Sequence, residues 1–184
     1  MEKRSSLVLP VEPYTVSGHG FGDHIRRHFL LWAVHLGDDV LAEAGTPVKV
    51  VADGEVVWSE TRRGRSEKKN WGGIVVVKSQ IPNSKFQITN MTTFYSVYGH
   101  IADLKVKVGD KVTAGQAIGA VAMGNTPENG WWEKPHLHFG IYTGPWKDEV
   151  LAGWWRPEHW RRTKVKWWVN PREFLSGKIK EPNS

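Results

Sequence analysis

Short apolar runs and alternating polar and apolar positions fill most of the chain, and both are typical of β-strands. The β-branched run at 72–77 and the aromatic alternation at 93–98 each predict a strand. Two valine-rich runs meet at Asp53-Gly54, which predicts a β-hairpin over 48–57. A further meander is expected over 106–121, broken at two glycine turns. Because no window of helical length has a sustained helical period before the C-terminal region, we expect a mainly β, antiparallel fold.

The chain also contains a short internal echo. Gly45-Thr46-Pro47-Val48 resembles Gly109-Asp110-Lys111-Val112, and a further glycine-containing turn follows each of them. Such four-residue echoes arise readily in strands rich in glycine and valine, so the echo alone is only weak evidence of a duplicated strand unit. The length of 184 residues is the usual size of one domain, and we expect a single domain over 1–184.

Composition narrows the class of protein. With 40% hydrophobic and 24% charged residues and no apolar run of transmembrane length, the chain is expected to be neither disordered nor membrane-spanning. The formal net charge of +6 either favours an anionic partner or serves ordinary solubility. The absence of cysteine excludes disulfides, thiolate zinc sites and cysteine nucleophiles, so any metal site must use nitrogen and oxygen ligands.

Eleven tryptophans are far more than a chain of this length usually carries, and several lie in the basic tail at 145–184. We expect Trp154-Trp155, Trp160 and Trp167-Trp168 to close the core of a small β-domain. Interleaved tryptophan and arginine would also suit a stacking surface for single-stranded nucleic acid. Such surfaces usually lie on an open face beside a basic groove, and we expect no nucleic-acid partner.

Two loops and the N-terminal segment give less information about function. The loop at 61–70 is mostly charged, and it is either a solvated turn or a basic lip of a substrate groove. The loop at 123–134 is rich in glycine, asparagine and proline. The first twelve residues lack the basic-then-apolar pattern of a secretory signal, so we expect either an intracellular protein or one whose leader is missing.

The candidate chemistry lies in histidines and one aspartate. In an extended segment, His35 and Asp39 share one face, and Gly37 leaves the space between them clear. His136 and His138 share one face of a predicted strand, with their apolar neighbours toward the core. His100 adds a candidate at the end of the strand at 93–98. A catalytic zinc ion typically takes three such ligands and leaves the fourth position to water.

Other histidines have different interpretations. His24 and His28 would share one helical face and form a rival metal pair, but the glutamate of the helical zinc-protease motif is absent. We expect His159, which lies among tryptophans, to be structural. Taken alone, His100 would also fit a core histidine whose ring nitrogens are hydrogen-bonded.

Taken in order, these motifs resemble the M23 family of zinc metallopeptidases, the lysostaphin-type and LytM-type peptidoglycan endopeptidases. The resemblance is carried by His35-x-Gly-x-Asp39, Gly45-Thr46-Pro47-Val48, Tyr98-Gly99-His100, the 109–120 meander and His136-Leu137-His138-Phe139. It covers about 29–144, as the metallopeptidase core, and leaves 145–184 as a tryptophan-rich extension. It implies a small antiparallel β-sandwich, a barrel-sandwich hybrid built on a duplicated motif.

The resemblance also implies roles for five residues. One Zn²⁺ ion per chain would be bound by His35, Asp39 and His138, and the non-ligand catalytic histidines would be His100 and His136. The implied reaction is hydrolysis of a peptidoglycan peptide by a zinc-activated water, with one histidine as base and the other stabilising the oxyanion. The sequence does not decide which histidine does which, nor the oligomeric state.

Three further expectations concern the cellular location of the protein and alternative functions. The implied substrate lies outside the cytoplasmic membrane, which conflicts with the absence of a visible signal. A catalytically inactive relative that binds cell wall or a partner is the main alternative, although such proteins usually lack one or more ligands and all five positions are filled here. A phosphocarrier of the same strand architecture would leave His35 and Asp39 without a role.

Overall fold

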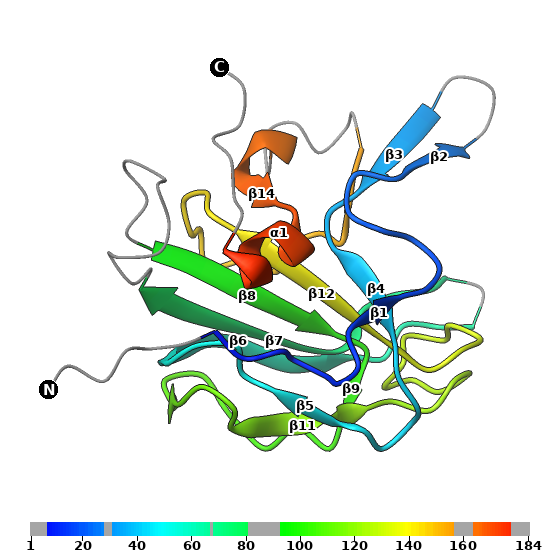
Figure 1. Ribbon diagram of the computed structural model, residues 1–184. Helices are drawn as coiled ribbons and strands as arrows, with labels where there is room; N and C mark the ends of the chain where they lie inside the picture. Colours follow the sequence, from blue (N-terminus) through cyan, green and yellow to red (C-terminus); the bar gives the residue numbers. More distant parts are fainter. Residues whose placement is uncertain (1–6, 28–30, 67, 81–92, 157–163, 178–184) are drawn as a thin grey trace, which may run out of the picture.

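Antiparallel strands make up most of the structure. The computed structural model describes residues 7–27, 31–66, 68–80, 93–156 and 164–177 (Figure 1). Every strand pairing among these residues is antiparallel. Their α-helical content is the short helix α1, Pro171–Ser176. The predicted mainly β, antiparallel class is therefore confirmed.

The strands form one large sheet and two small ones. In spatial order, the large sheet contains β1 (Thr15–Val16), β4 (Asp38–Leu41), β12 (His136–Tyr142), β8 (Thr93–Gly99), β7 (Gly72–Gln80), β6 (Gly54–Arg62) and β10 (Lys111–Val112), and β14 (Trp168–Val169) also pairs with β12. One small sheet contains β5 (Pro47–Lys49), β11 (Ala117–Val121) and β9 (Ile101–Ala102). The other contains β13 (Trp154–Trp155), β3 (Leu31–His35) and β2 (His24–Arg27). A 3-10 turn, Val165–Trp167, precedes β14.

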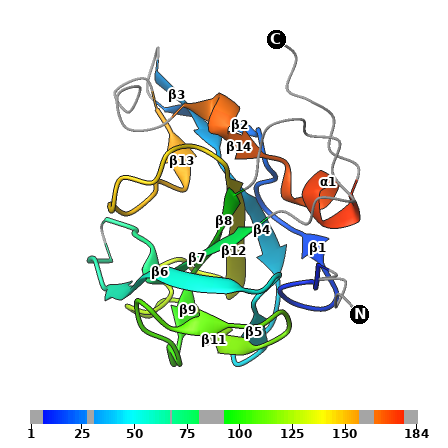
Figure 2. The ribbon, with the colours of Figure 1, turned by 90° about the vertical axis from the view of Figure 1, so that its left-hand side faces the viewer.

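The large sheet buries apolar side chains on both of its faces. Strand alternation in β7 sends Val75 and Val77 to one face and Ile74 and Val76 to the other. The first face packs against the β5-β11-β9 sheet and α1, which lie below and beside the large sheet in Figure 2. The second face is covered mainly by aromatic side chains from loops and the C-terminal tail.

The internal echo has a counterpart in backbone hydrogen bonds. Gly45 donates to the Val121 carbonyl at 2.9 Å, and Val121 donates back to Thr46 at 2.9 Å. In the second copy, Gly109 donates to the Val56 carbonyl at 2.8 Å, and Val56 donates back to Asp110 at 2.9 Å. Both glycines have positive φ, 86° and 92°, which glycine adopts without strain. The two copies therefore build the same turn on two different sheets, as expected for a duplicated strand unit.

The hairpin predicted over 48–57 is wrong. The runs on either side of Asp53-Gly54 become β5 and β6, but β5 pairs with β11 and β6 pairs with β7 and β10. Val50 and Val51 between them are fully buried, and Val50 exchanges backbone hydrogen bonds with the turn at Gly115 and Gln116. The chain thus crosses from one sheet to the other at this point. The meander predicted over 106–121 is divided between the same two sheets.

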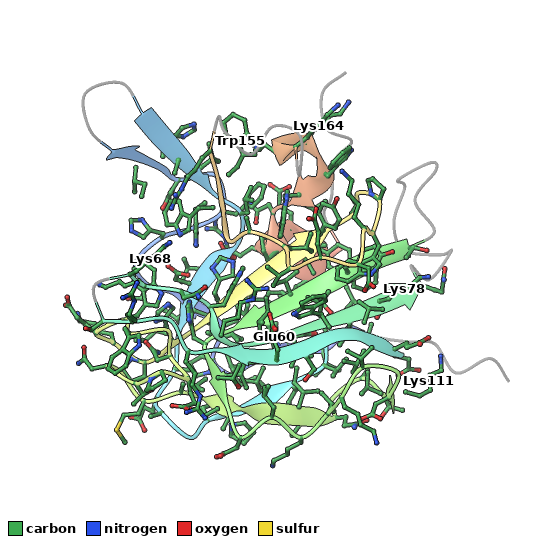
Figure 3. The ribbon with its side chains drawn as sticks, turned by 180° about the vertical axis from the view of Figure 1, so that it is seen from behind. Glu60, Lys68, Lys78, Lys111, Trp155 and Lys164 are labelled. Atoms are coloured by element: carbon green, nitrogen blue, oxygen red, sulfur yellow. The ribbon has the colours of Figure 1, made fainter. Side chains whose placement is uncertain are left out.

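Tryptophans of the tail pack on the second face of the large sheet. Trp168 is buried there, and Trp155 and Trp167 are half-buried against the same cluster. Figure 3 shows Trp155 beside the β2–β3 hairpin, consistent with the pairing of β13 and β3. The expectation that the tail tryptophans close a core is confirmed for Trp155, Trp167 and Trp168. Trp154 is half-buried outside this cluster, and Trp160 lies outside the described residues. No helix in the described part of the chain is long and apolar enough to cross a membrane.

Candidate metal centre

Three strands bring His35, Asp39 and His138 together. His35 ends β3, Asp39 is the second residue of β4, and His138 lies in β12 directly opposite Asp39 in the antiparallel register. The segment from His35 to Asp39 is not one continuous strand, because the chain leaves the β3 sheet after His35 and enters the large sheet at Asp38. The side chains of His35 and Asp39 nevertheless converge, as expected.

The donor atoms of these three residues lie at the spacing of a tetrahedral metal site. His138 Nδ1 is 3.1 Å from His35 Nε2 and 3.1 Å from Asp39 Oδ1, and His35 Nε2 is 3.3 Å from Asp39 Oδ1. Ligands about 2.0–2.1 Å from a tetrahedral zinc ion are separated by about 3.3–3.4 Å. Two imidazoles and one carboxylate are also ligand types that zinc takes in catalytic sites. The residues present therefore fit a zinc ion.

The protonation states of the cluster suit metal binding. Burial would raise the pKa of Asp39, but the interactions with the neighbouring His138 and His35 outweigh burial and lower it well below its usual value. Burial lowers the pKa of His138 to about 4, against the opposing effect of Asp39. At neutral pH the carboxylate is thus charged and the His138 ring is neutral, as ligands must be.

An outer hydrogen bond orients the His35 ring. Its Nδ1 lies 3.2 Å from the backbone carbonyl oxygen of Gly20, which can only accept a hydrogen bond. Nδ1 therefore carries the proton, and Nε2 presents its lone pair toward Asp39 and His138. The Nε2 atom of His138 is buried and has no hydrogen-bond partner among the described residues.

His100 and His136 lie next to the three-residue cluster. Their rings are 4.5 Å apart, and the His136 Nε2 atom is 3.9 Å from Asp39 Oδ1. His136 Nδ1 lies 2.9 Å from the Lys134 carbonyl oxygen, so Nδ1 is the protonated nitrogen and Nε2 carries a lone pair. His100 follows β8 with a positive φ of 65° and is 4% exposed. Burial, followed by the neighbouring His136 and His138, lowers the pKa of His100 well below its usual value.

The structure thus brings all five predicted site residues together, and their roles stay predictions. His24 lies in β2 as an exposed strand residue, not on a helix, so a shared helical face with His28 does not arise from this element. His28 itself and His159 lie outside the described residues. The predicted strand face of His136 and His138 is confirmed, since Leu137 and Phe139 belong to the buried core.

Aromatic residues that the sequence did not assign to the site surround it. The Trp154 ring lies 4.3 Å from that of His35, and the Trp71 ring meets His138 edge-on at 4.9 Å. Trp132 lies 6.0 Å from His100 and 6.1 Å from His136. His19 contacts Trp154 edge-on at 5.0 Å. The only sequence signal for these contacts was the excess of tryptophan, which does not indicate what each ring packs against.

The charged loop at 61–70 contacts Trp132, one of the aromatic residues around the site. Its described side chains up to Lys69 are exposed, and Lys68 marks it in Figure 3 on the side of the molecule opposite Lys78 and Lys111. Lys69 Nζ lies 4.7 Å from the centre of the Trp132 ring, and the Trp132 indole donates to the Asn70 carbonyl at 3.3 Å. The exposure of its side chains fits the interpretation as a solvated turn. The contacts of Lys69 and Asn70 with Trp132 bring the end of the loop toward His100 and His136, as the interpretation as a groove lip would require.

Gly37 gives a testable prediction. A Cβ atom at this position would lie 2.5 Å from the Phe139 carbonyl oxygen and 2.6 Å from His138 Nε2, with little freedom for either to move. We expect Gly37→Ala to destabilise the metal-free protein by about 2 kcal/mol or more in urea unfolding, because overpacking shifts backbone as well as side chains. Gly177→Ala is the control: its φ of 70° is strained but its surroundings are open, so it should cost about 1 kcal/mol. Equal losses would contradict the crowding at Gly37.

Comparison with known proteins gives an independent view of the same region. The sequence matches the model of peptidase family M23 over residues 33–149, a range that includes all five predicted site residues. A segment of 119 residues is 34% identical to the glycyl-glycine endopeptidase ALE-1 of Staphylococcus capitis. That match covers 63% of this chain but only 26% of the relative.

Two solved structures are similar as well. The catalytic domain of the antimicrobial peptidase lysostaphin from Staphylococcus simulans aligns with a TM-score of 0.53 and 24% identity, covering 86% of this chain and 90% of that one, and this likeness concerns the fold. A zinc containing peptidase from Vibrio cholerae aligns with a TM-score of 0.53 and 25% identity, covering 76% of this chain and 37% of that one.

Proposed function

Because the chain belongs to peptidase family M23, we propose that it is a zinc-dependent endopeptidase that hydrolyses stem or cross-bridge peptides of peptidoglycan. The observation that carries the proposal is the cluster of His35, Asp39 and His138, with donor atoms 3.1–3.3 Å apart beside two further histidines. We propose one zinc ion per chain and, because peptidoglycan lies outside the cytoplasmic membrane, action in the cell envelope or beyond it.

The geometry supports a division of roles between His136 and His100. When bound, zinc lowers the pKa of a water molecule toward neutrality and so supplies the nucleophile for hydrolysis. His136 is proposed to accept the proton, because its Nδ1–H is used by the Lys134 carbonyl and its free Nε2 lies on the side of Asp39. The hydrogen bond to the Lys134 carbonyl also fixes the orientation of the His136 ring.

His100 is proposed to stabilise the developing negative charge on the peptide oxygen. Its Nδ1 is buried and has no hydrogen-bond partner among the described residues. Because its pKa is lowered by burial, the ring stays neutral at physiological pH, and its single proton serves as the proposed donor in the tautomer that carries it on Nδ1. A donor in a site with little water stabilises an oxyanion more strongly than the same donor in bulk water.

Incubation of the zinc-loaded protein with purified peptidoglycan tests the proposed function. We expect soluble peptides whose new amino termini identify the cleaved bond by mass spectrometry, and we expect release to stop when a chelator removes the metal. The His136→Ala variant loaded with zinc serves as the control for contaminating hydrolases. Binding to the insoluble polymer without release of any peptide would contradict the proposal and favour an inactive cell-wall-binding relative.

A further inference from the structure

Asp38, the neighbour of the predicted metal ligand Asp39, is a fully buried carboxylate with no role in the proposed reaction. Strand alternation in β4 turns its side chain away from that of Asp39. Its Oδ1 accepts a hydrogen bond from the Phe21 backbone N–H at 2.9 Å. Its Oδ2 accepts from the Tyr14 hydroxyl at 3.0 Å and lies 3.4 Å from Arg172 Nε. Buried polar groups usually have hydrogen-bond partners, and here a single carboxylate connects three segments that are distant in the sequence.

The contact with Phe21 leads directly to the metal centre. The Phe21 N–H and the Gly20 carbonyl are the two polar ends of one peptide group, and in a trans peptide they point in opposite directions. The N–H end donates to Asp38, while the carbonyl end accepts from His35 Nδ1 at 3.2 Å. One peptide group therefore joins the Asp38 carboxylate to the ring of a predicted metal ligand.

We propose that Asp38 is a positioning residue for the metal centre and acts on His35 through the peptide group between Gly20 and Phe21. Metal-binding histidines usually donate their second ring nitrogen to a carboxylate or a carbonyl, which orients the ring and strengthens the ligand. Here the carboxylate polarises the peptide, so the Gly20 carbonyl becomes a better acceptor and His35 Nε2 a stronger donor to the metal. The inference rests on the proposed zinc site and deepens it.

The surroundings of Asp38 fix the orientation of its carboxylate. Arg172, at the start of α1, supplies a positive charge to Oδ2. Burial, followed by the charge of Asp38, raises the pKa of Tyr14, so its hydroxyl stays protonated and can only donate to the carboxylate. With Oδ2 occupied by these two partners, Oδ1 is left for Phe21.

The loop at 17–23, which contains the bridging peptide, is fixed to both strands of the site. The Asp39 N–H donates to the His19 carbonyl at 2.8 Å, and the Ser17 N–H donates to the Asp39 carbonyl at 2.9 Å. The Gly22 N–H donates to the His35 carbonyl at 2.9 Å. The peptide therefore has little freedom to turn, and a change in its polarisation should reach the His35 ring.

Asp38→Asn tests this relay from Asp38 through the Gly20–Phe21 peptide group to His35. The substitution preserves the shape of the side chain and an oxygen acceptor while removing the charge. We expect the zinc dissociation constant, measured by competition with a chelator, to rise by about 10–100-fold, the usual effect of an outer-shell partner. The visible spectrum of the cobalt-substituted protein should shift as well. Asp23→Asn is the matched control, since Asp23 accepts from the Gly20 N–H at 2.7 Å in the same loop but not from the bridging peptide. We expect it to leave the affinity and the spectrum unchanged.

A measurement on the unmodified protein keeps the test independent of how well Asp38→Asn folds. Zinc loading should move the Phe21 amide proton resonance downfield by more than that of Gly22, which bonds to the His35 backbone but not to its ring. Equal shifts of the two amides, or equal zinc affinities of the Asp38→Asn and unmodified proteins, would overturn the relay alone. Failure of the unmodified protein to bind zinc would overturn both the relay and the proposed metal centre.

Discussion

Replacing His138 by alanine is expected to weaken zinc binding by more than about 100-fold, because loss of an outer-shell partner alone costs about 10–100-fold. The His138 Nδ1 atom lies 3.1 Å from both other predicted donors, so its removal would leave two of the three predicted ligands. His35→Ala and Asp39→Ala should act in the same direction. The zinc content after dialysis and the dissociation constant from chelator competition measure the effect.

The control for this loss is His24→Ala, which alters the rival metal pair and should leave zinc content at one ion per chain. Circular dichroism of the metal-free proteins separates ligand loss from misfolding, since His138 is 2% exposed and packs against Trp71. Full zinc stoichiometry in all three ligand variants would refute the assignment. Loss of zinc in His24→Ala alone would move the site to the pair of His24 and His28.

His136 and His138 could be found from the sequence because they lie in a short motif with strand geometry, whereas His35 and Asp39 meet across a break between two strands. Spacing by two residues fixes His136 and His138 on one face of β12 whatever the strand pairs with. The register that sets His138 opposite Asp39 could not be read in the same way, since about a hundred residues separate the two strands. The family resemblance supplied that long-range information.

The wrong hairpin at Asp53-Gly54 shows where local patterns fail. A turn signal specifies the local backbone, and it says nothing about which strands pair on either side of the turn. The valines between β5 and β6 are buried in the core between the sheets, so burial favours a crossing of the chain over a hairpin. The internal echo was more informative, because it marked the equivalent turn on each sheet.

Asp38 and the tryptophans around the site had no usable local signal. Strand alternation predicts only that Asp38 points away from Asp39, and its partners Tyr14 and Arg172 come from opposite ends of the described chain. Likewise, Trp71 reaches His138 because Gly99 has no side chain: a Cβ there would lie 2.4 Å from the indole ring. Contacts of this kind depend on the three-dimensional packing of segments that are remote in sequence.

The second large effect is expected for His136→Ala, which should retain one zinc ion per chain and lose about two to four orders of magnitude in kcat for peptide release. The His136 Nε2 atom is proposed to accept the proton of the attacking water, and alanine cannot. Its distance of 3.9 Å from Asp39 Oδ1 places it beside the predicted metal ligands and outside the group of three close donors, so metal binding should survive.

His100→Ala provides the comparison that tests the division of roles. Both variants should lose kcat, but the limb of the pH–rate profile that reports the general base should disappear only in His136→Ala, because His100 is proposed to donate a hydrogen bond and not to accept the proton. His24→Ala, an exposed histidine in β2, should keep the unmodified kcat and profile. If His136→Ala kept kcat within about tenfold of the unmodified protein, its loss would be too small for a general base, and proton transfer would have to be assigned to His100.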